Sequence, residues 1–110
     1  MTTVGLLSLK EITAIVKQKF QAIFQDDLIT LVLFGSQARG DANLESDIDI
    51  LVVLKEKNNR DKKREAILDF IFDVSLEFGV LVSCVYVSQA QFEQEKSPLL
   101  LNIRREGIVL

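Results

Sequence analysis

Two aspartates one residue apart, Asp47 and Asp49, open a strongly apolar run that ends at Leu54. In a β-strand, residues i and i+2 point to the same face, and the strand rise places their Cα atoms roughly 6.6 Å apart. Carboxylates held in this way can bind a hard divalent cation between them. Alternatively, Asp47 is simply exposed and Asp49 pairs with a nearby Arg or Lys. Asp is depleted in strands and costly to bury unpaired, so the pattern favours a metal site with Asp47 and Asp49 as catalytic ligands.

A polar turn precedes these acids, where the apolar run 28–34 ends at Gly35 and Ser36. Gly35 leaves bare backbone that a phosphate can approach closely, and Ser36 can cap a short helix whose exposed N–H groups favour anions. Arg39 can reach a phosphate or pair with Asp41 at the surface, where such a pair contributes little. The alternative for the whole turn is a plain helix cap. An anion site next to a metal site indicates metal–nucleotide chemistry, with Gly35, Ser36 and Arg39 as nucleotide-binding residues.

The apolar periodicity predicts the elements that position these groups. Helices are expected over 9–24, after a capping box at Ser8, and over 62–78, ended by Gly79. Strands are expected over 28–34, 47–54 and 80–87, with one tight helical turn over 35–40, which Gly40 would end, and a polar loop over 41–46. Short helices follow the caps Ser88 and Ser97-Pro98, the second ends at Gly107, and residues 108–110 form a short apolar tail. The order predicts an α+β fold with a three-stranded mixed sheet flanked by helices, in an α-β-α-β-α-β core, but leaves the directions of the first two strands open.

Two surface features allow more than one interpretation. The helix over 62–78 carries a second apolar row, Leu68, Phe72 and Leu76, which predicts either a broadly buried helix or a partner surface. The charged block 55–65 interleaves acids with Lys and Arg, so a solvated loop and first helical turn is favoured over a nucleic-acid patch.

Composition excludes several classes of function. The 110 residues are expected to form a single domain over 1–110, and 48% hydrophobic residues favour a folded globule. A net charge of −3 disfavours a nucleic-acid binder, and the absence of His excludes a Ser–His triad. The only cysteine, Cys84, lies in an apolar run and is expected to be a buried thiol in a reducing compartment. With no signal-peptide pattern and no membrane-length apolar run, the expected location is cytoplasmic.

Gly35-Ser36, ten further residues and then Asp47-Ile48-Asp49 resemble the signature of the DNA polymerase β superfamily of nucleotidyltransferases. More narrowly, the segments 35–40 and 46–49 resemble the minimal nucleotidyltransferases, many of which are antitoxin-like partners of HEPN-domain proteins. The resemblance implies the nucleotidyltransferase fold and a Mg²⁺-dependent enzyme that uses ATP or another nucleoside triphosphate. It also implies transfer of a nucleotidyl group, AMP from ATP being the expected one, onto a hydroxyl of a partner protein. The expected partner is a HEPN-domain-like protein or another copy of this chain, with no membrane and no nucleic acid.

One position departs from the family pattern, which usually has a third carboxylate on the strand after the long helix. The strand over 80–87 has no acid, Ser83 is its most polar residue, and Glu77 lies before Gly79 and substitutes poorly. Two hypotheses therefore remain. The chain is either a nucleotidyltransferase, or a catalytically weakened module that binds a Mg-nucleotide and neutralises its partner by docking.

Overall fold

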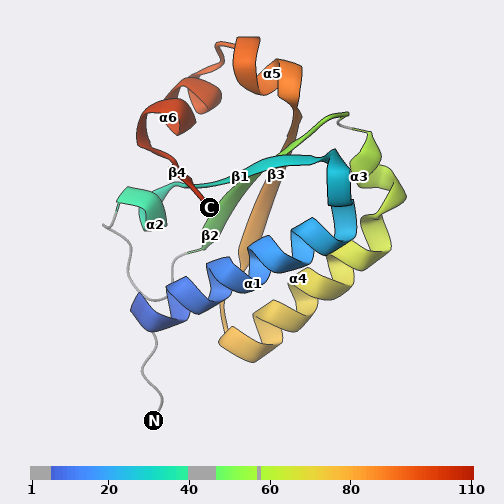
Figure 1. Cartoon of the computed structure of the whole chain (residues 1–110). Helices are drawn as coiled ribbons and strands as arrows, with labels where there is room; N and C mark the ends of the chain where they lie inside the picture. Colours follow the sequence, from blue (N-terminus) through green and yellow to red (C-terminus); the bar gives the residue numbers. More distant parts are fainter. Residues whose placement is uncertain (1–5, 40–46, 57) are drawn as a thin grey trace.

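A mixed sheet of four strands separates two layers of helices in the computed structural model, which describes residues 6–39, 47–56 and 58–110 (Figure 1). The strands are β1 (Leu28–Phe34), β2 (Ile48–Leu54), β3 (Val82–Ser88) and β4 (Ile108–Val109). The helices are α1 (Leu6–Phe24), α2 (Ser36–Arg39), α3 (Asn59–Lys62), α4 (Arg64–Phe78), α5 (Gln89–Gln94) and α6 (Pro98–Glu106), with a 3₁₀ turn η1 (Gln25–Asp27) after α1. The α+β class with a mixed sheet is therefore confirmed.

The strand order is β3-β2-β1-β4, and the prediction of three strands was wrong. β1 is antiparallel to β2 and to β4, whereas β2 and β3 are parallel. The expected apolar tail is the fourth strand, because Ile108 and Val109 pair with Leu33 and Val32 of β1. The amide of Leu110 also donates to the carbonyl of Leu31 at 2.9 Å. A segment of two residues is too short to show the side-chain alternation of a strand. Its extended conformation is explained only by its pairing with β1.

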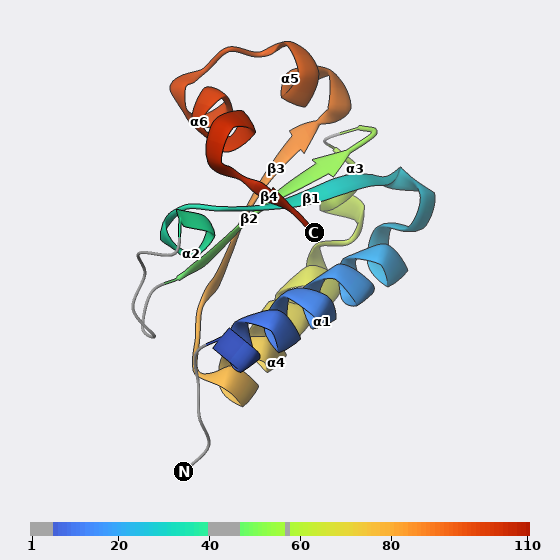
Figure 2. The same ribbon diagram turned by 60° about the vertical axis from the view of Figure 1, so that its left-hand side comes forward.

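The alternation of side chains along β2 assigns each helical layer to one face of the sheet. Ile48, Ile50, Val52 and Leu54 belong to the core cluster that includes residues of α1 and α4. Leu51 and Val53 belong to the cluster formed with Leu100 and Ile103 of α6. Figures 1 and 2 show these two helical layers on opposite sides of the sheet. By the same alternation, Asp49 shares the face of Leu51 and Val53 and lies on the α5/α6 side.

Local capping chemistry explains most of the helix boundaries. Ser88 and Gln91 form a complete capping box at the start of α5, and Ser97 accepts from the amide of Leu100 at the start of α6. Gly79 ends α4 with a left-handed φ of 68°. The capping box expected at Ser8 was wrong, because α1 already begins at Leu6 and places Ser8 inside the helix. The described helices include none that could cross a membrane.

The charged segment before α4 adopts a short helix of its own. The helix expected over 62–78 is α4, which begins at Arg64, and the short helix α3 precedes it, with Lys63 between the two helices at a φ of −113°. Almost all described residues of the block 55–65 are exposed, as a solvated segment requires. The third strand also begins later than expected, at Val82 and not at residue 80.

The second apolar row of α4 is exposed. The relative exposures of Leu68, Phe72 and Leu76 are 55%, 63% and 70%, whereas Phe70 is buried against Phe20 of α1. The interpretation of α4 as a broadly buried helix was therefore wrong. Helical periodicity locates the row but does not show which neighbours cover it, and the described part of the chain places no element over these three side chains.

Phe72→Glu is expected to change the free energy of unfolding by less than about 0.5 kcal/mol, because an exposed side chain loses little packing. Phe70→Glu on the same helix is the matched control and is expected to unfold the protein, since it buries an unpaired charge. Urea denaturation followed by circular dichroism measures both. A comparable loss of stability in the two variants would contradict the exposure of Phe72.

Candidate functional site

Asp49 lies in the middle of the sheet, with one strand on each side of it. Its register partner on β1 is Phe34, the residue before Gly35, and its register partner on β3 is Ser83. Asp49 is half-buried, whereas Asp47, immediately before β2, is exposed. The structure thus brings the glycine turn, the two acids and Ser83 to the same end of the sheet.

The carboxyl group of Asp49 is harder to ionise than an ordinary aspartate. Burial raises its pKa, and the nearby charge of Asp47 raises it further. The two acids are therefore close enough to repel each other when no cation is present. A divalent cation would relieve this repulsion, so the electrostatics of the pair fit a metal ligand set.

Gly35 lies against the carboxylate of Asp49, although Gly35 belongs to the turn after β1 and Asp49 belongs to β2. A Cβ atom built on Gly35 would overlap Oδ2 of Asp49, and it would lie 3.3 Å from the carboxyl carbon. Gly35 also has a φ of 78°, a left-handed conformation that other residues adopt only with strain. Both observations explain why a glycine stands at this position, and they place its backbone directly against the acid.

Gly35→Ala is expected to lower the stability by about 1–3 kcal/mol and to disturb Mg-ATP binding by displacing the Asp49 carboxylate. Gly79→Ala is the matched control, because Gly79 has a similar φ of 68° but no atom within 4 Å of the added Cβ. Gly79→Ala should therefore lose stability and keep nucleotide binding. Thermal denaturation and calorimetry with Mg-ATP measure the two effects, and equal binding by the two variants would contradict the role of the contact.

The turn after β1 forms the short helix α2, as expected for residues 35–40. The carbonyl of Gly35 accepts from the amides of Ala38 and Arg39, at 3.1 and 3.2 Å. Gly35 is therefore the N-cap residue and Ser36 is the first helical residue, so the expectation that Ser36 caps the helix was wrong. Ser36 is half-buried beside Gly35. The predicted exit at Gly40 and loop 41–46 lie outside the described residues.

Arg39 extends from the end of α2 toward the C-terminus of α6. Its Nη1 atom lies 3.7 Å from Oε2 of Glu106, and both side chains are substantially exposed. The suggested pairing with Asp41 lies outside the described residues. Glu106 is a residue that the sequence did not single out, because nothing in its local pattern relates it to the glycine turn. Its carboxylate stabilises Arg39 beside the turn only weakly, as an exposed ion pair does.

Ser83 occupies the position on β3 that lies next to Asp49. The two residues are register partners in the parallel pair, and neighbouring strands are about 4.8 Å apart. Ser83 is exposed, and its neighbours on the same strand face, Val85 and Val87, are apolar. A carboxylate at this position would lie beside Asp49 on the neighbouring strand, whereas Ser83 supplies only a hydroxyl.

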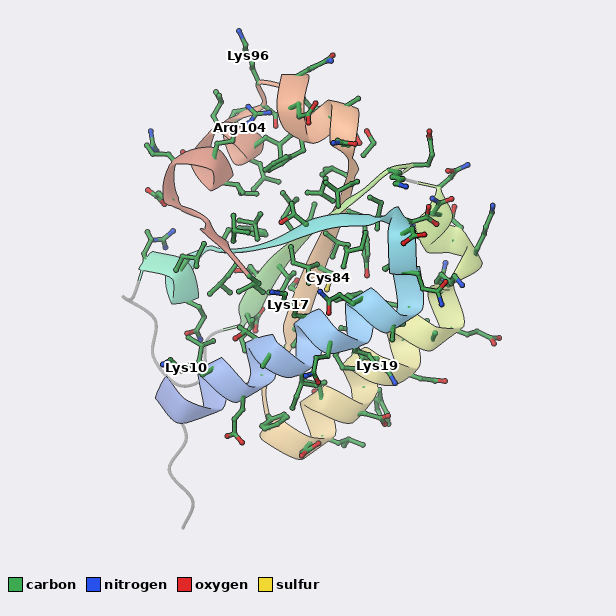
Figure 3. All side chains as sticks on the ribbon, viewed as in Figure 1. Lys10, Lys17, Lys19, Cys84, Lys96 and Arg104 are labelled. Carbon is green, nitrogen blue, oxygen red and sulfur yellow. The ribbon has the colours of Figure 1, made fainter. Side chains whose placement is uncertain are left out.

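Cys84 is not a suitable nucleophile. Its side chain packs against the core cluster on the α1/α4 side of the sheet, away from the face of Asp49 (Figure 3). Burial raises the pKa of its thiol to about 12, although a hydrogen bond with Tyr86 acts in the opposite direction. The group therefore stays protonated at neutral pH.

The polar groups at this end of the sheet fit a Mg-nucleotide. Mg²⁺ is usually bound by one or two carboxylates together with phosphate oxygens of the substrate, and Asp47 and Asp49 are two such carboxylates. Among the described residues, no group of three or more His, Cys, Asp and Glu side chains gathers as a metal site. A nucleotide would therefore complete the ligand set.

Comparison with known proteins identifies the family. A sequence model of the family described as "Nucleotidyltransferase domain" matches residues 9–109. A protein of Methanocaldococcus jannaschii named "Putative protein adenylyltransferase" is 35% identical over 88 residues, which are 78% of this chain and 60% of that protein. The chain thus spans less than two thirds of the length of this relative. A second protein of the same organism with the same description is 31% identical over 104 residues, which are 94% of each chain.

The fold agrees with this assignment. A crystal structure described as a toxin–antitoxin with AMP-PNP superposes with a TM-score of 0.58, covering 91% of this chain and 69% of that chain at 18% identity. At this identity the likeness concerns the fold alone. The match of the family model over nearly the whole chain shows that this protein belongs to the nucleotidyltransferase domain family.

Proposed function

We propose that this chain is a Mg²⁺-dependent nucleotidyltransferase that transfers AMP from ATP to a hydroxyl group of a partner protein. The contact between Gly35 and the Asp49 carboxylate carries the proposal, because it joins a phosphate-accessible backbone to a metal-binding acid. The two relatives named as protein adenylyltransferases support AMP as the transferred group and a protein as the acceptor.

Each polar residue at the site has a proposed role. Asp47 and Asp49 hold Mg²⁺, which neutralises phosphate charge when it is bound with the nucleotide. Gly35 and Ser36 receive the triphosphate at the start of α2, and Arg39, oriented by Glu106, contacts a phosphate oxygen. The glycine turn thus positions the nucleotide on the β1 side of Asp49.

The reaction joins the acceptor oxygen to the α-phosphorus of ATP. The bond between that phosphorus and the oxygen bridging to the β-phosphate breaks, and pyrophosphate leaves. The proton of the acceptor hydroxyl must pass to a base as the oxygen attacks. No carboxylate stands at Ser83 to accept it, so the proton passes to solvent and the reaction is slow.

The proposed partner is a HEPN-domain-like protein, with this chain in the role of the antitoxin. The motif resemblance suggests this pairing, and the toxin–antitoxin structure of the same fold supports a protein partner. Modification of a partner hydroxyl would alter the partner by adding a charged, bulky AMP group.

One observation favours a second candidate function. Because Ser83 replaces a carboxylate beside Asp49, the site can bind a Mg-nucleotide and still fail to activate an acceptor. The chain would then act as a nucleotide-binding module that neutralises its partner by docking.

Transfer of radioactive label separates the two functions. The chain and its partner are incubated with ATP labelled at the α- or the γ-phosphate, with Mg²⁺ or with a chelator. An enzyme places α-label but not γ-label on the partner, and only when Mg²⁺ is present. Mg-ATP binding without transfer of label would support the docking module. Absence of Mg-ATP binding would overturn both functions.

A further inference from the structure

A groove of about 420 Å³ lies between β3 and the helices α3 and α4, on the α4 side of the sheet. Ile67, Leu68 and Ile71 of α4 provide its apolar side. Arg60 and Arg64 add two guanidinium groups, and Ser83 of β3 also lines the groove. The groove therefore begins next to the register partner of Asp49 and combines apolar surface with positive charge.

The strand that borders this groove has an unpaired edge. β3 is the outer strand of the described sheet and pairs only with β2. The outer backbone groups of an edge strand can bond to a further extended segment, and pockets beside the strand then select its side chains. Ser83 is exposed at this edge and is small, so it leaves room for a side chain to reach toward Asp49.

The two sides of Asp49 are not equivalent. On the β1 side lie Phe34 and Gly35, followed by α2 and the Arg39–Glu106 ion pair. On the β3 side lies Ser83, at the outer edge of the described sheet. A nucleotide on the glycine turn leaves the β3 side for the second substrate. The open side of Asp49, where an acceptor would approach, is therefore the side of Ser83.

The charges of the groove suit an acidic ligand. The guanidinium of Arg60 lies over the ring of Tyr86, 5.3 Å from its centroid. Arg60 also contacts Asp61 at 3.3 Å, but both side chains are exposed, so this pair compensates the charge only weakly. The buried Tyr86 hydroxyl has no nitrogen or oxygen partner among the described residues. Guanidinium groups bind carboxylates through strong, directional hydrogen bonds.

The strand spacing relates the two ends of the groove. Tyr86 follows Ser83 by three positions, which corresponds to roughly 10 Å along a strand. An odd separation places the two side chains on opposite faces, Ser83 on the face of Asp49 and Tyr86 on the face of α4. An extended segment lying along β3 would show the same alternation, so its residues three apart would also reach these two faces.

We propose that the groove binds an extended segment of the acceptor protein as an added strand on β3. The acceptor hydroxyl lies at Ser83, and an acidic side chain three residues away binds Arg60 and Arg64. This inference rests on the proposed function, since it assigns the acceptor side of the same site. The preferred substrate is then a Ser, Thr or Tyr residue with an acidic residue three positions before or after it.

Matched peptides test the groove independently of catalysis. Each fluorescent peptide carries Ser, Thr or Tyr, with Glu or Lys three residues before or after it. Binding to the full chain with Mg-ATP is followed by fluorescence anisotropy. We expect the Glu peptides to bind at least about tenfold more tightly than the Lys peptides, as a charge-assisted pair allows. Equal binding of the Glu and Lys peptides would overturn the proposal.

Charge reversal in the protein identifies the residues responsible. The double variant Arg60→Glu, Arg64→Glu is expected to reverse the preference toward the Lys peptides. The control Lys62→Glu, Lys63→Glu makes the same charge change in the same segment but outside the groove lining, and it should keep the original preference. A preference for Glu that survives the Arg60 and Arg64 changes would overturn the assignment.

Backbone methylation tests the added strand. Peptides N-methylated at alternate residues cannot donate to β3 from one side, so one of the two methylation registers should lose binding at least about tenfold. Unchanged binding in both registers would contradict the added strand. Transfer of α-label to the same peptides is measured in parallel. Selective binding without transfer would contradict the proposed enzymatic activity but support peptide binding in the groove. Transfer without selectivity would support the enzymatic activity and contradict the proposed peptide binding.

Discussion

Asp49→Asn is expected to lower the affinity for Mg-ATP by more than about 100-fold. Loss of a group that only supports a metal ligand typically costs 10–100-fold, so loss of a ligand itself should cost more. The proposed ligand lies against Gly35 and beside Asp47, and an amide there cannot replace the negative charge. Isothermal titration calorimetry with Mg-ATP measures the change, with Asp73→Asn on the exposed face of α4 as the control. Unchanged affinity in Asp49→Asn would remove Asp49 from the metal site.

The same variant should be more stable than the wild type when no metal is present. Because burial and Asp47 raise the pKa of Asp49, the folded state binds a proton more tightly than the unfolded state. Wild-type stability therefore falls as the pH rises from the ordinary range of a carboxyl group through the raised pKa. Asp49→Asn removes this titrating group. The variant should therefore be more stable than the wild type at neutral pH, and the difference in stability should disappear in acid. A pH series of melting temperatures in chelator measures it, and an advantage that grows in acid would contradict the raised pKa.

Ser83→Asp is expected to increase the rate of AMP transfer by about 10²–10⁴-fold, the usual contribution of a general base. Ser83 is the register partner of Asp49, so the introduced carboxylate stands beside the acceptor side of the site. Nucleotide affinity should not improve, because the new group acts on the acceptor hydroxyl. Like charge near Asp49 should also lower stability in the absence of Mg²⁺.

The variant Ser83→Asn distinguishes the effect of an added general base from the effect of a larger side chain. Asn has the shape of Asp but accepts no proton at neutral pH, so it should leave transfer close to the wild-type rate. Label transfer to the partner is measured for the wild type and both variants. A wild type that is already fast, with Ser83→Asp inert or harmful, would show that the base lies elsewhere or comes from the partner. No transfer from any form would favour the docking module.

The sequence by itself determined most of the local elements and the family of the protein. A continuous apolar run predicted β1 over 28–34, with the bounds that the structure shows. Ser88 and Ser97 predicted the starts of α5 and α6, because an N-cap acts on amides only two or three residues away. The motif formed by Gly35-Ser36 and Asp47-Ile48-Asp49 resembles that of the nucleotidyltransferases, and the family match confirms this resemblance.

The tertiary structure decided how these elements meet. Side-chain periodicity assigns residues to faces, but it contains no information on the direction or the neighbour of a strand. Only the fold shows that β1 and β2 are antiparallel, that β2 and β3 are parallel, and that Ile108 and Val109 form a fourth strand.

The contacts between residues of the site also depend on the tertiary structure. The contact of Gly35 with Asp49, the register of Asp49 with Ser83 and the pairing of Arg39 with Glu106 all join residues of different elements. The exposure of Phe72 likewise depends on which helices cover α4. A sequence specifies which side chains can bind metal, phosphate or an apolar surface. Distances between those groups depend on the packing of segments far apart in the chain, which local pattern does not encode.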